Sequence, residues 1–394
     1  MGSTLSKNES ERTDSPSSVR YLVSVLERRI HSGQYPHGQW LPTERTLCEE
    51  FALGRPAVRQ AIGELERRRL VRRSARHRPV VWRDDSGTAR SVLPTNGRKS
   101  IGLWISGDPS DPGPMAMTRS ILQALPSEQY RLVMTCPQNE SRISAVQAEA
   151  QVLHRLATDD DCAGLILWYL GGSANTPALE AFRAQGKPLV FVDRKPPTGF
   201  EADYVGVQNT TAAMEAVQHL LSQGHRDIAH ITNAEGTSAV IERHLGYEQA
   251  LQAVGIPFRP DLVLSSDLIP NDEAGEQQHW RQVAARFLAL PSPPTAAFAV
   301  NDYTASRFIR ALRENAVRVP DDVAVIGFDN SERWRHQEAP FMSSVSQPFE
   351  QIGAEAVSLL RERLEGTPGT TYRHVLMNAP LVVRQSSEQQ RSQV

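Results

Sequence analysis

Residues 41–73, LPTERTLCEEFALGRPAVRQAIGELERRRLVRR, constrain the fold of this chain more than any other stretch. Their pattern predicts two short helices separated by a tight turn at Gly54. Thr43 is placed to cap the first helix, because its hydroxyl can accept from a backbone N–H that has no partner inside the helix. Pro56 suits the first turn of the second helix, where no N–H donor is needed. The stretch is therefore expected to fold as a helix-turn-helix.

Both predicted helices have one apolar face. Leu47 and Phe51 lie four residues apart in the first helix. The second helix carries an apolar stripe at the i, i+3, i+4 and i+7 positions, formed by Val58, Ala61, Ile62 and Leu65. Arg59 and Gln60 project from its other side, and Arg55 stands at its N-terminal end. A DNA-reading helix requires this arrangement, because one Arg can bond two acceptors of a guanine edge or two phosphate oxygens.

This stretch resembles the winged-helix domain of the GntR family, whose usual pattern is L-P-S-E-R, a helix, S-R-x-T-V-R-x-A-L and L-E-x-x-G-L-V. The matching residues are Leu41, Pro42, Glu44, Arg45, Arg55, Val58, Arg59, Ala61, Leu65, Glu66, Leu70 and Val71. The resemblance implies that Arg45, Arg55 and Arg59 contact DNA. Gly54 and Ala57 replace the usual Ser and Thr, which removes two hydroxyls that could bind phosphate. The alternative interpretation is a solvated helix pair rich in arginine.

Two further pieces complete the predicted winged-helix domain, residues 19–83. Residues 19–31 predict a preceding helix, whose apolar face is formed by Val19, Leu22, Val25, Leu26 and Ile30. Residues 71–73 and 80–82 predict the two strands of a small wing. The tip at 74–78 can reach phosphate or the minor groove, and a mobile charged hairpin tip is the alternative. The predicted DNA-binding residues are Thr43, Arg45, Arg55, Pro56, Arg59, Gln60, Arg76, His77 and Arg78.

Charge is distributed unevenly along the chain. Residues 19–83 contain fourteen arginines, no lysine and six glutamates, an excess of eight positive charges. The net charge of the whole chain is −2, so the rest carries an excess of ten negative charges. A basic block on an otherwise acidic chain is typical of a nucleic-acid-binding module.

Length and composition set the wider limits. A chain of 394 residues is long enough for two or three domains with sizeable cores. It has no run of about 18 apolar residues, so no transmembrane helix is expected. Residues 1–18 are polar, predict a disordered tail and lack the apolar core of a secretory signal. Cys48, Cys136 and Cys162 are odd in number and widely spaced, so we expect neither disulfides nor a zinc site, and a cytoplasmic location with the nucleoid.

After a predicted linker at residues 84–98, apolar runs alternate with segments of helix length. The apolar runs occupy 101–105, 132–134, 164–168, 189–192, 228–231, 297–300 and 323–328. The helix-length segments occupy about 114–125, 141–157, 176–185, 210–224, 241–254, 276–289 and 302–315. Continuous apolar strands between helices indicate parallel sheets that are covered on both faces. The pattern predicts an α/β fold with two doubly wound lobes.

Polar residues follow several of these strands, at the end of the sheet where ligands of open α/β folds bind. They are Ser106 and Asp108, Asp193 and Arg194, Asn301 and Asp302, and Asp329 and Asn330; Arg243 comes shortly after the strand at 228–231. Asp, Asn and Arg offer planar two-point hydrogen bonding, which suits vicinal hydroxyls or a carboxylate. Each residue alone can equally be a helix cap or a loop residue. Several of them at comparable strand ends favour a ligand site.

A series of motifs runs through residues 192–386, within a resemblance that covers about 99–387. In order they are V-D-R at 192–194, V-x-V-x-N at 205–209, H-L-L-x-x-G-H-R-x-I-A at 219–229, E-R-x-x-G-Y at 242–247, T-A-x-F-A-x-N-D at 295–302, V-P-D-D-V-A-V-I-G-F-D at 319–329, V-S-Q-P at 345–348 and L-V-V-R-x-S at 381–386. They closely resemble the effector-binding domain of the LacI/GalR family, which has the periplasmic-binding-protein fold. The resemblance implies an effector domain at 99–388, with lobe one at about 99–205 and 347–376 and lobe two at about 206–346 and 377–388.

The resemblance also places the ligand cleft. It implies cleft residues at Asp193, Arg194, Arg243, Asn301, Asp329 and Gln347. Trp104, Trp168 and Tyr169 lie near strand ends and would either stack on a sugar ring or belong to the core. Trp334 is the stronger candidate for a cleft wall. The predicted effector-binding residues are Ser106, Asp108, Asp193, Arg194, Arg243, Asn301, Asp302, Asp329, Trp334 and Gln347.

Other kinds of chemistry are not indicated. No G-x-G-x-x-G follows the first strand, and no P-loop G-K-[ST] occurs. None of the four lysines lies in a setting that suggests a Schiff base. His219, His225 and His230 belong to a helix-to-strand connection, which favours a structural role over metal binding. Asp193 and Asp329 leave a glycosidase-like carboxylate pair open. We expect a protein that is not an enzyme and that holds no cofactor or metal.

A GntR-type head joined to a LacI-type domain resembles the arabinose-repressor type of bacterial regulator, which implies a pentose or related sugar as effector. We expect a ligand-responsive transcriptional regulator, with a repressor favoured. Two heads in a homodimer would bind a pseudo-palindromic operator, and closure of the lobes on the effector would change DNA affinity. Two alternatives stay open: a sugar sensor whose basic head docks a protein partner, and a regulator that senses a purine or a sugar phosphate.

Overall fold

The structure is a computed structural model. It describes residues 16–31, 35, 39–51, 53–67, 70–72, 78–81, 97–105, 111–136, 142–234, 236–266, 273–331, 340–366 and 371–388. The chain divides into two compact units, Met1–Asn96 and Gly97–Val394. Most of the predicted tail and of the predicted linker lies outside the described residues. No helix in these ranges is long and apolar enough to cross a membrane.

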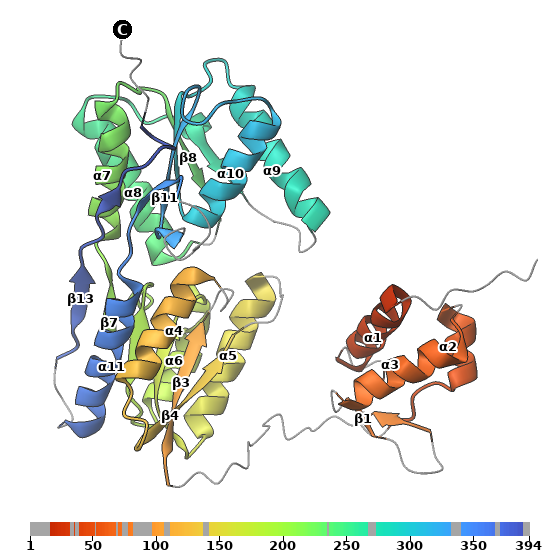
Figure 1. Ribbon diagram of the computed structural model, residues 1–394. Coiled ribbons are helices and arrows are strands. Elements are labelled where there is room, and N and C mark those ends of the chain that lie inside the picture. The colour runs from red at the N-terminus through yellow and green to blue at the C-terminus, as the bar shows by residue number, and fades with distance from the viewer. Residues whose placement is uncertain are drawn as a thin grey trace, which may run out of the picture. The chain divides into compact units, whose positions relative to one another are not determined.

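The described residues of the first unit, which we call the head, form three helices and a small hairpin (Figure 1). The elements are α1 (Pro16–His31), α2 (Glu44–Phe51), α3 (Arg55–Arg67), β1 (Val71–Arg72) and β2 (Val80–Val81). The two strands pair antiparallel, with Val71 opposite Val81. The N–H of Val81 donates to the carbonyl of Gln39 at 2.7 Å, so the chain before α2 runs beside the hairpin.

The predicted apolar stripe of α3 forms the centre of the head core. Its four residues, Val58, Ala61, Ile62 and Leu65, are at most 1% exposed. In α1 the buried face includes Val23, whereas the predicted Val25 is only half-buried. The positions 19, 22, 23, 26 and 30 follow the helical period, which explains this correction. The helix also begins at Pro16, three residues earlier than predicted, because proline is tolerated in a first turn.

Among its described residues, the second unit contains two six-stranded sheets. The first sheet has the order β13-β7-β6-β5-β3-β4, and all its neighbouring strands are parallel. We call this sheet and the helices packed on it lobe one. Its elements are β3 (Lys99–Ile105), α4 (Pro112–Ala124), β4 (Tyr130–Thr135), α5 (Arg142–Thr158), β5 (Cys162–Trp168), η1 (Gly172–Asn175), α6 (Thr176–Arg183), β6 (Leu189–Val192), β7 (Asp203–Val207), α11 (Phe349–Glu365) and β13 (His374–Met377).

The second sheet has the order β14-β12-β11-β10-β8-β9, with only the β12–β14 pair antiparallel among the described strands. We call it and its helices lobe two. Its elements are α7 (Asn209–Ser222), β8 (Ile228–Thr232), α8 (Ser238–Ala253), η2 (Pro260–Leu262), β9 (Val263–Ser265), α9 (Glu273–Leu288), β10 (Ala296–Ala299), α10 (Asp302–Glu314), β11 (Ala324–Phe328), β12 (Ser343–Val345) and β14 (Leu381–Val382).

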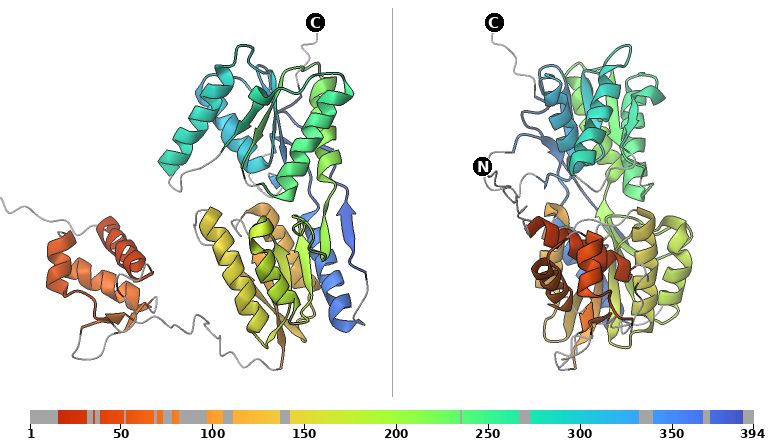
Figure 2. Two further views of the ribbon diagram at one scale, coloured as in Figure 1. Left: turned by 180° about the vertical axis from the view of Figure 1, so that it is seen from behind. Right: turned by 90° about the vertical axis from the view of Figure 1, so that its right-hand side faces the viewer.

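Each sheet is covered by helices on both faces (Figure 2). In lobe one, α4 and α11 pack on one face and α5 and α6 on the other. In lobe two, α7 and α8 cover one face and α9 and α10 the other. The fold is therefore the predicted α/β class, with two doubly wound lobes. The chain passes between the sheets after β7, after β12 and after β13.

Candidate functional site

The predicted DNA-binding side chains of α2 and α3 lie on the surface of the head. Arg45, Arg55, Pro56, Arg59 and Gln60 are all exposed, while the stripe on the opposite side of α3 is buried. The helix thus has a packed back and a solvated face that carries long donors. Such a face can enter a DNA groove without unpacking the core.

Two of these arginines have carboxylate neighbours. The Nε of Arg59 donates to Glu44 at 2.9 Å, and Arg45 lies 3.7 Å from Glu49. Arg45, Glu49 and Arg59 are exposed and Glu44 is half-buried, so each pair is worth little and can be exchanged for a phosphate or a base. Glu44, the first residue of α2, therefore pairs with Arg59 in a contact that DNA can replace.

The helix cap predicted at Thr43 is present. The Oγ1 of Thr43 accepts from the backbone N–H of Thr46 at 3.1 Å, which fixes the start of α2. In the wing, Arg78 is exposed, as a phosphate-contacting residue must be. The other predicted wing residues, Arg76 and His77, lie outside the described residues.

In the second unit, unusual backbone conformations mark the ends of two strands. Asp193 follows β6 with φ 62°, and Asp329 and Asn330 follow β11 with φ 113° and 55°. Residues other than glycine rarely adopt positive φ, and such strained positions persist where the surroundings hold them and cluster at ligand sites. Two of these three residues are predicted effector-binding residues.

Arg243, in α8, is the most tightly held of the predicted cleft residues. Its side chain is 6% exposed, its Nε donates to Asn209 Oδ1 at 2.9 Å, and its Nη1 donates to the carbonyl of Val300 at 2.8 Å. The guanidinium carbon lies 3.7 Å from the centre of the Phe328 ring. Protein groups thus fix its position, which lowers the ordering cost of binding a ligand.

Arg243 brings two other predicted residues together. Its Nη1 lies 3.6 Å from Asp329 Oδ1, and the same oxygen accepts from Gln347 Nε2 at 2.8 Å. Burial raises the pKa of Asp329 to about 6, whereas Arg243 and Gln347 act in the opposite direction. The negative charges of Asp193 and Asp111 raise this pKa further, so carboxylates of lobe one lie near Asp329 of lobe two.

Asp193 and Arg194 form the lobe-one part of the candidate site. The carbonyl of Asp193 accepts from the Tyr204 hydroxyl at 3.1 Å, and its Oδ2 lies 3.8 Å from Arg194 Nε. Its Oδ1 is buried and has no hydrogen-bond partner within the described ranges. A buried carboxylate oxygen without a donor is costly, so this atom is a natural acceptor for a ligand hydroxyl.

The two predicted residues at the start of α10 have structural roles. Asn301 caps the helix, because its Oδ1 accepts from the N–H of Thr304 at 2.9 Å, and its amide nitrogen is the end that can donate to a ligand. The carboxylate of Asp302 is buried and accepts from Ser344 Oγ at 2.6 Å and from the N–H of Ser331 at 2.5 Å. Both of its oxygens are engaged, which argues against effector binding by Asp302.

The remaining predicted positions divide into two groups. Ser106, Asp108 and Trp334 lie outside the described residues. The three aromatic residues considered for stacking are buried: Trp104 is 1% exposed, Tyr169 3% and Trp168 9%. They belong to the cores of lobe one, so the stacking interpretation was wrong and the core interpretation is correct.

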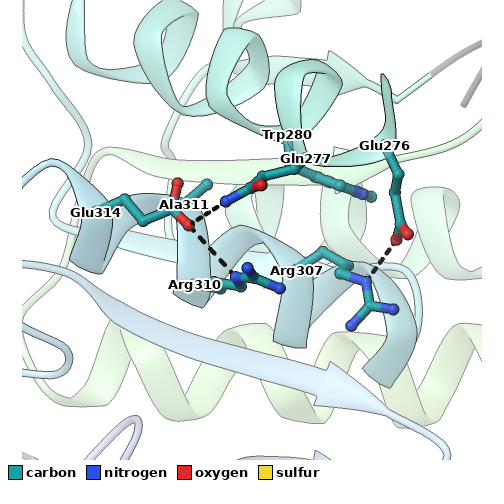
Figure 3. A pocket seen from close by; sticks show the side chains of 7 residues that line it. All are labelled: Glu276, Gln277, Trp280, Arg307, Arg310, Ala311 and Glu314. Carbon is teal, nitrogen blue, oxygen red and sulfur yellow. Dashed lines mark hydrogen bonds and ion pairs between the residues drawn. The ribbon is translucent and has the colours of Figure 1, made fainter. Parts of the chain in front are cut away.

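A pocket of about 300 Å³ lies elsewhere, between α9 and α10 (Figure 3). Its charged groups satisfy one another: Glu276 accepts from Tyr303 at 2.7 Å and from Arg307 at 2.5 Å, and Glu314 accepts from Gln277 at 3.0 Å. These groups need no ligand to balance them. The strained backbone and the unpartnered oxygen of Asp193 identify the strand ends as the better candidate site.

Sequence reasoning did not assign a role to three residues that hold the site. Asn209 contacts both Glu242 and the side chain of Arg243, and Glu242 precedes Arg243 in α8. Lys195 of lobe one forms an ion pair with Glu242. Asn209 and Glu242 belong to quoted motifs, but a motif does not show which side chain supports which. That information came only from their distances.

Comparisons with known proteins match both units. The model of the family "Bacterial regulatory proteins, gntR family" matches residues 21–81, and the model of the "Periplasmic binding protein-like domain" matches residues 217–387. HTH-type transcriptional regulator CelR of Thermobifida fusca is 36% identical over 206 residues, which are 51% of this chain and 57% of that protein. The aligned region thus spans little more than half the length of this relative.

Two solved structures share the fold of the second unit or of most of the chain. A LacI family transcriptional regulator from Enterococcus faecium with bound ribose aligns with a TM-score of 0.60 at 25% identity and covers 73% of this chain and 98% of its own. A transcriptional regulator CelR–cellobiose complex aligns with a TM-score of 0.60 at 25% identity and covers 94% of this chain and 98% of its own.

Proposed function

Because the chain joins a DNA-binding domain of the gntR family to a periplasmic-binding-protein-like domain, we propose that it is a ligand-responsive regulator of bacterial transcription, acting as a repressor. It is a binding protein rather than an enzyme. The observation that carries the proposal is the head itself, whose α3 is packed on one side and presents arginines on the other. Its work on chromosomal DNA would place it in the cytoplasm.

In this function α3 is the recognition helix and lies in the major groove. Arg55 and Arg59 read base edges or phosphates near its start, and Arg45 and Thr43 contact the backbone from α2. Arg78, in the wing, contacts the phosphate backbone of the DNA strand that borders the groove. Helix-turn-helix dimers bind two half-sites about one helical turn apart, so the operator is pseudo-palindromic.

The effector is a small sugar, with a pentose favoured, bound between the two strand ends. Arg243 and Gln347 supply donors, and Asp193 and Asp329 supply acceptors, which together match vicinal hydroxyl groups. Two structural relatives are complexes with ribose and with cellobiose, which supports a sugar for this chain. Arg194 and the amide of Asn301 complete the proposed site.

A thermal-shift screen of the full chain tests the effector class. Its panel holds D-ribose, L-arabinose, D-xylose, cellobiose, purine nucleosides and sugar phosphates. A ligand at about 100 times its Kd stabilises the protein by about 2.7 kcal/mol. A response to one pentose supports the proposal. A response only to a purine or a sugar phosphate refutes the sugar assignment, and a flat panel argues against a sensing cleft.

Arg243→Ala is the matched site variant for this screen. The substitution leaves Asp329 without its cation and should remove the stabilisation by the effector. Arg259→Ala is the control, because Arg259 is a half-buried arginine of the same lobe that pairs with Asp227 and Asp261. If the response survives in Arg243→Ala, the assigned cleft is wrong.

The salt dependence of binding distinguishes DNA from a protein partner. For a head that neutralises several phosphates, the logarithm of the DNA association constant falls linearly with the logarithm of the salt concentration. The slope is about −0.9 per phosphate contact. We expect a steep slope for duplex DNA selected from random sequence. The absence of any duplex binding at about 50 mM salt would favour a head that docks a protein.

A further inference from the structure

Lys195 links the two lobes beside the candidate site. It lies three residues after the end of β6, directly after Asp193 and Arg194 in lobe one. Its backbone N–H donates to Ser238 Oγ at 2.8 Å, and its ammonium group forms an ion pair with Glu242. Both partners belong to the first two turns of α8 in lobe two. One residue thus makes a main-chain and a side-chain contact across the lobes.

The contact continues from Glu242 into the site. Glu242 Oε2 accepts from Asn209 Nδ2 at 3.3 Å, and Asn209 Oδ1 accepts from Arg243 Nε at 2.9 Å. Asn209 is 1% exposed, so its amide is shielded from solvent. A continuous series of polar contacts therefore runs from the lysine of lobe one to the arginine that holds Asp329.

The orientation of the Asn209 amide depends on both neighbours. Its NH2 faces a carboxylate and its oxygen faces a guanidinium N–H, so each end meets a group of the opposite kind. Rotating the amide by 180° would place its NH2 against the N–H of Arg243 and its oxygen against the carboxylate of Glu242, and neither contact is a hydrogen bond. Glu242 thereby fixes which end of Asn209 faces Arg243, and Arg243 keeps a partner for its buried Nε.

We propose that Lys195, Glu242 and Asn209 form an inter-lobe clasp that positions Arg243 for the effector. The clasp rests on the proposed function in that Arg243 is taken to bind the effector. It forms only while the segment that carries Asp193 and Arg194 lies against α8. Formation of the clasp and binding of the effector are therefore linked. Each raises the equilibrium constant of the other by the same factor.

The exposure of the ion pair limits the size of the effect. The Lys195 side chain is 38% exposed and that of Glu242 19%, so solvent screens their attraction. Pairs of this kind contribute modestly, and we expect Lys195→Met to weaken sugar binding about three- to fivefold. Asn209→Ala removes the partner of a buried donor, and we expect a loss of about tenfold or more.

Hydrogen–deuterium exchange on the ligand-free full chain tests the clasp without any effector. Lys195→Met and Glu242→Gln should each speed exchange at residues 193–199 and at the start of α8. The double variant should exchange no faster than either single variant, because the same contact is lost in all three. Lys195→Arg, which keeps the charge, should restore the slow exchange.

Lys99→Met is the matched control. Lys99 is an exposed lysine of lobe one whose Nζ donates to the carbonyl of Asp160 at 2.9 Å, away from α8. It should leave exchange at 193–199 and in α8 unchanged. Unchanged exchange in Lys195→Met, or purely additive changes in the double variant, overturns the clasp.

Titration with D-ribose, L-arabinose and cellobiose separates this inference from the proposed function. If the wild type binds one of these sugars and Lys195→Met binds it equally well, the clasp does not position Arg243. If the wild type binds none of them and does not bind D-xylose either, the sugar proposal fails, and the exchange experiment alone then decides whether the clasp exists.

Discussion

At the scale of single residues, Asp329 stands out because its charge depends on its surroundings. Burial raises the pKa of this carboxyl to about 6, with Asp193 and Asp111 adding to the shift and Arg243 and Gln347 opposing it. A carboxyl with a pKa in this range is partly protonated just below neutral pH. Its ionised form offers acceptors on both oxygens, whereas protonation turns one oxygen into a donor, so effector binding to the carboxylate and proton release are coupled.

We therefore expect effector affinity to depend on pH with a definite sign. Binding favours the carboxylate, so affinity should be constant above about pH 7 and fall by up to about tenfold per unit below about pH 6. Calorimetric titration of the sugar found in the screen, between about pH 5 and 8, measures this slope. Asp329→Asn should bind weakly with no slope from this group. Affinity that rises on acidification would contradict the assignment.

A second prediction at the scale of single residues concerns Arg59 in the head. If it reads a base, Arg59→Ala should weaken binding to the specific operator by about 1–3 kcal/mol and relax selectivity at one position. Arg67→Ala is the control, since Arg67 is an exposed arginine in the last turn of the same helix and pairs with Glu64. Gel-shift titrations on specific and scrambled duplexes measure both. Equal affinity of Arg59→Ala and wild type would remove Arg59 from recognition.

At the scale of elements, two helical glycines have opposite surroundings. A Cβ on Gly246 in α8 would lie 2.3 Å from the carbonyl oxygen of Thr210 and 2.8 Å from the Cβ of Ala213, both in α7. A Cβ on Gly63 in α3 would meet nothing within 4 Å. Gly246 allows α7 and α8 to pack closely, whereas Gly63 only lowers helix propensity.

Alanine at these two positions should therefore change stability in opposite directions. Gly63→Ala should stabilise the head by about 0.5–1 kcal/mol, because glycine costs that much inside a helix. Gly246→Ala should destabilise the second unit by about 1–3 kcal/mol through overpacking. Scanning calorimetry of the full chain measures both. A Gly246→Ala protein as stable as the wild type would show that α7 and α8 can separate at little cost.

The same element scale shows what a sequence can and cannot predict. The helix stripe of α3 and the apolar runs of β5 and β6 follow simple periods, and their burial is as predicted. β12 was not predicted because two of its three residues are serines. Both are fully buried, and Ser343 and Ser344 are satisfied by Arg384 and Asp302 from distant parts of the chain. Hydrophobic pattern cannot reveal a strand that is buried through hydrogen bonds.

The candidate site shows the same limit more sharply. Strand-end position and resemblance identified Asp193, Arg243 and Asp329 as cleft residues, which is still a prediction. Position could not distinguish them from Asp302, whose carboxylate lies at a similar strand end but is used by Ser344 and Ser331. Tertiary contacts decide which group a side chain faces, and its position along one sequence does not reveal those contacts.

At the scale of the whole molecule, two neighbouring elements of lobe one leave apolar side chains in solvent. Met115 and Leu122 of α4 are 44% and 55% exposed, and Val133 and Met134 of β4 are 39% and 46% exposed. β4 is an edge strand of its sheet, and natural proteins usually protect such edges with charge or a covering element. A second copy of the chain is the partner that the proposed pseudo-palindromic operator requires.

Leu122→Glu should then convert a dimer into a monomer, because a charge would be buried in the interface. A monomer loses the gain from binding two linked half-sites, and we expect operator affinity to fall about 10²-fold or more. Val254→Glu is the control, since Val254 is 51% exposed at the end of α8 in lobe two. Sedimentation velocity and operator titration on both variants measure assembly and affinity together. A dimeric Leu122→Glu protein with unchanged operator affinity would place the dimer contact elsewhere, whereas a monomer with unchanged affinity would separate DNA binding from dimerisation altogether.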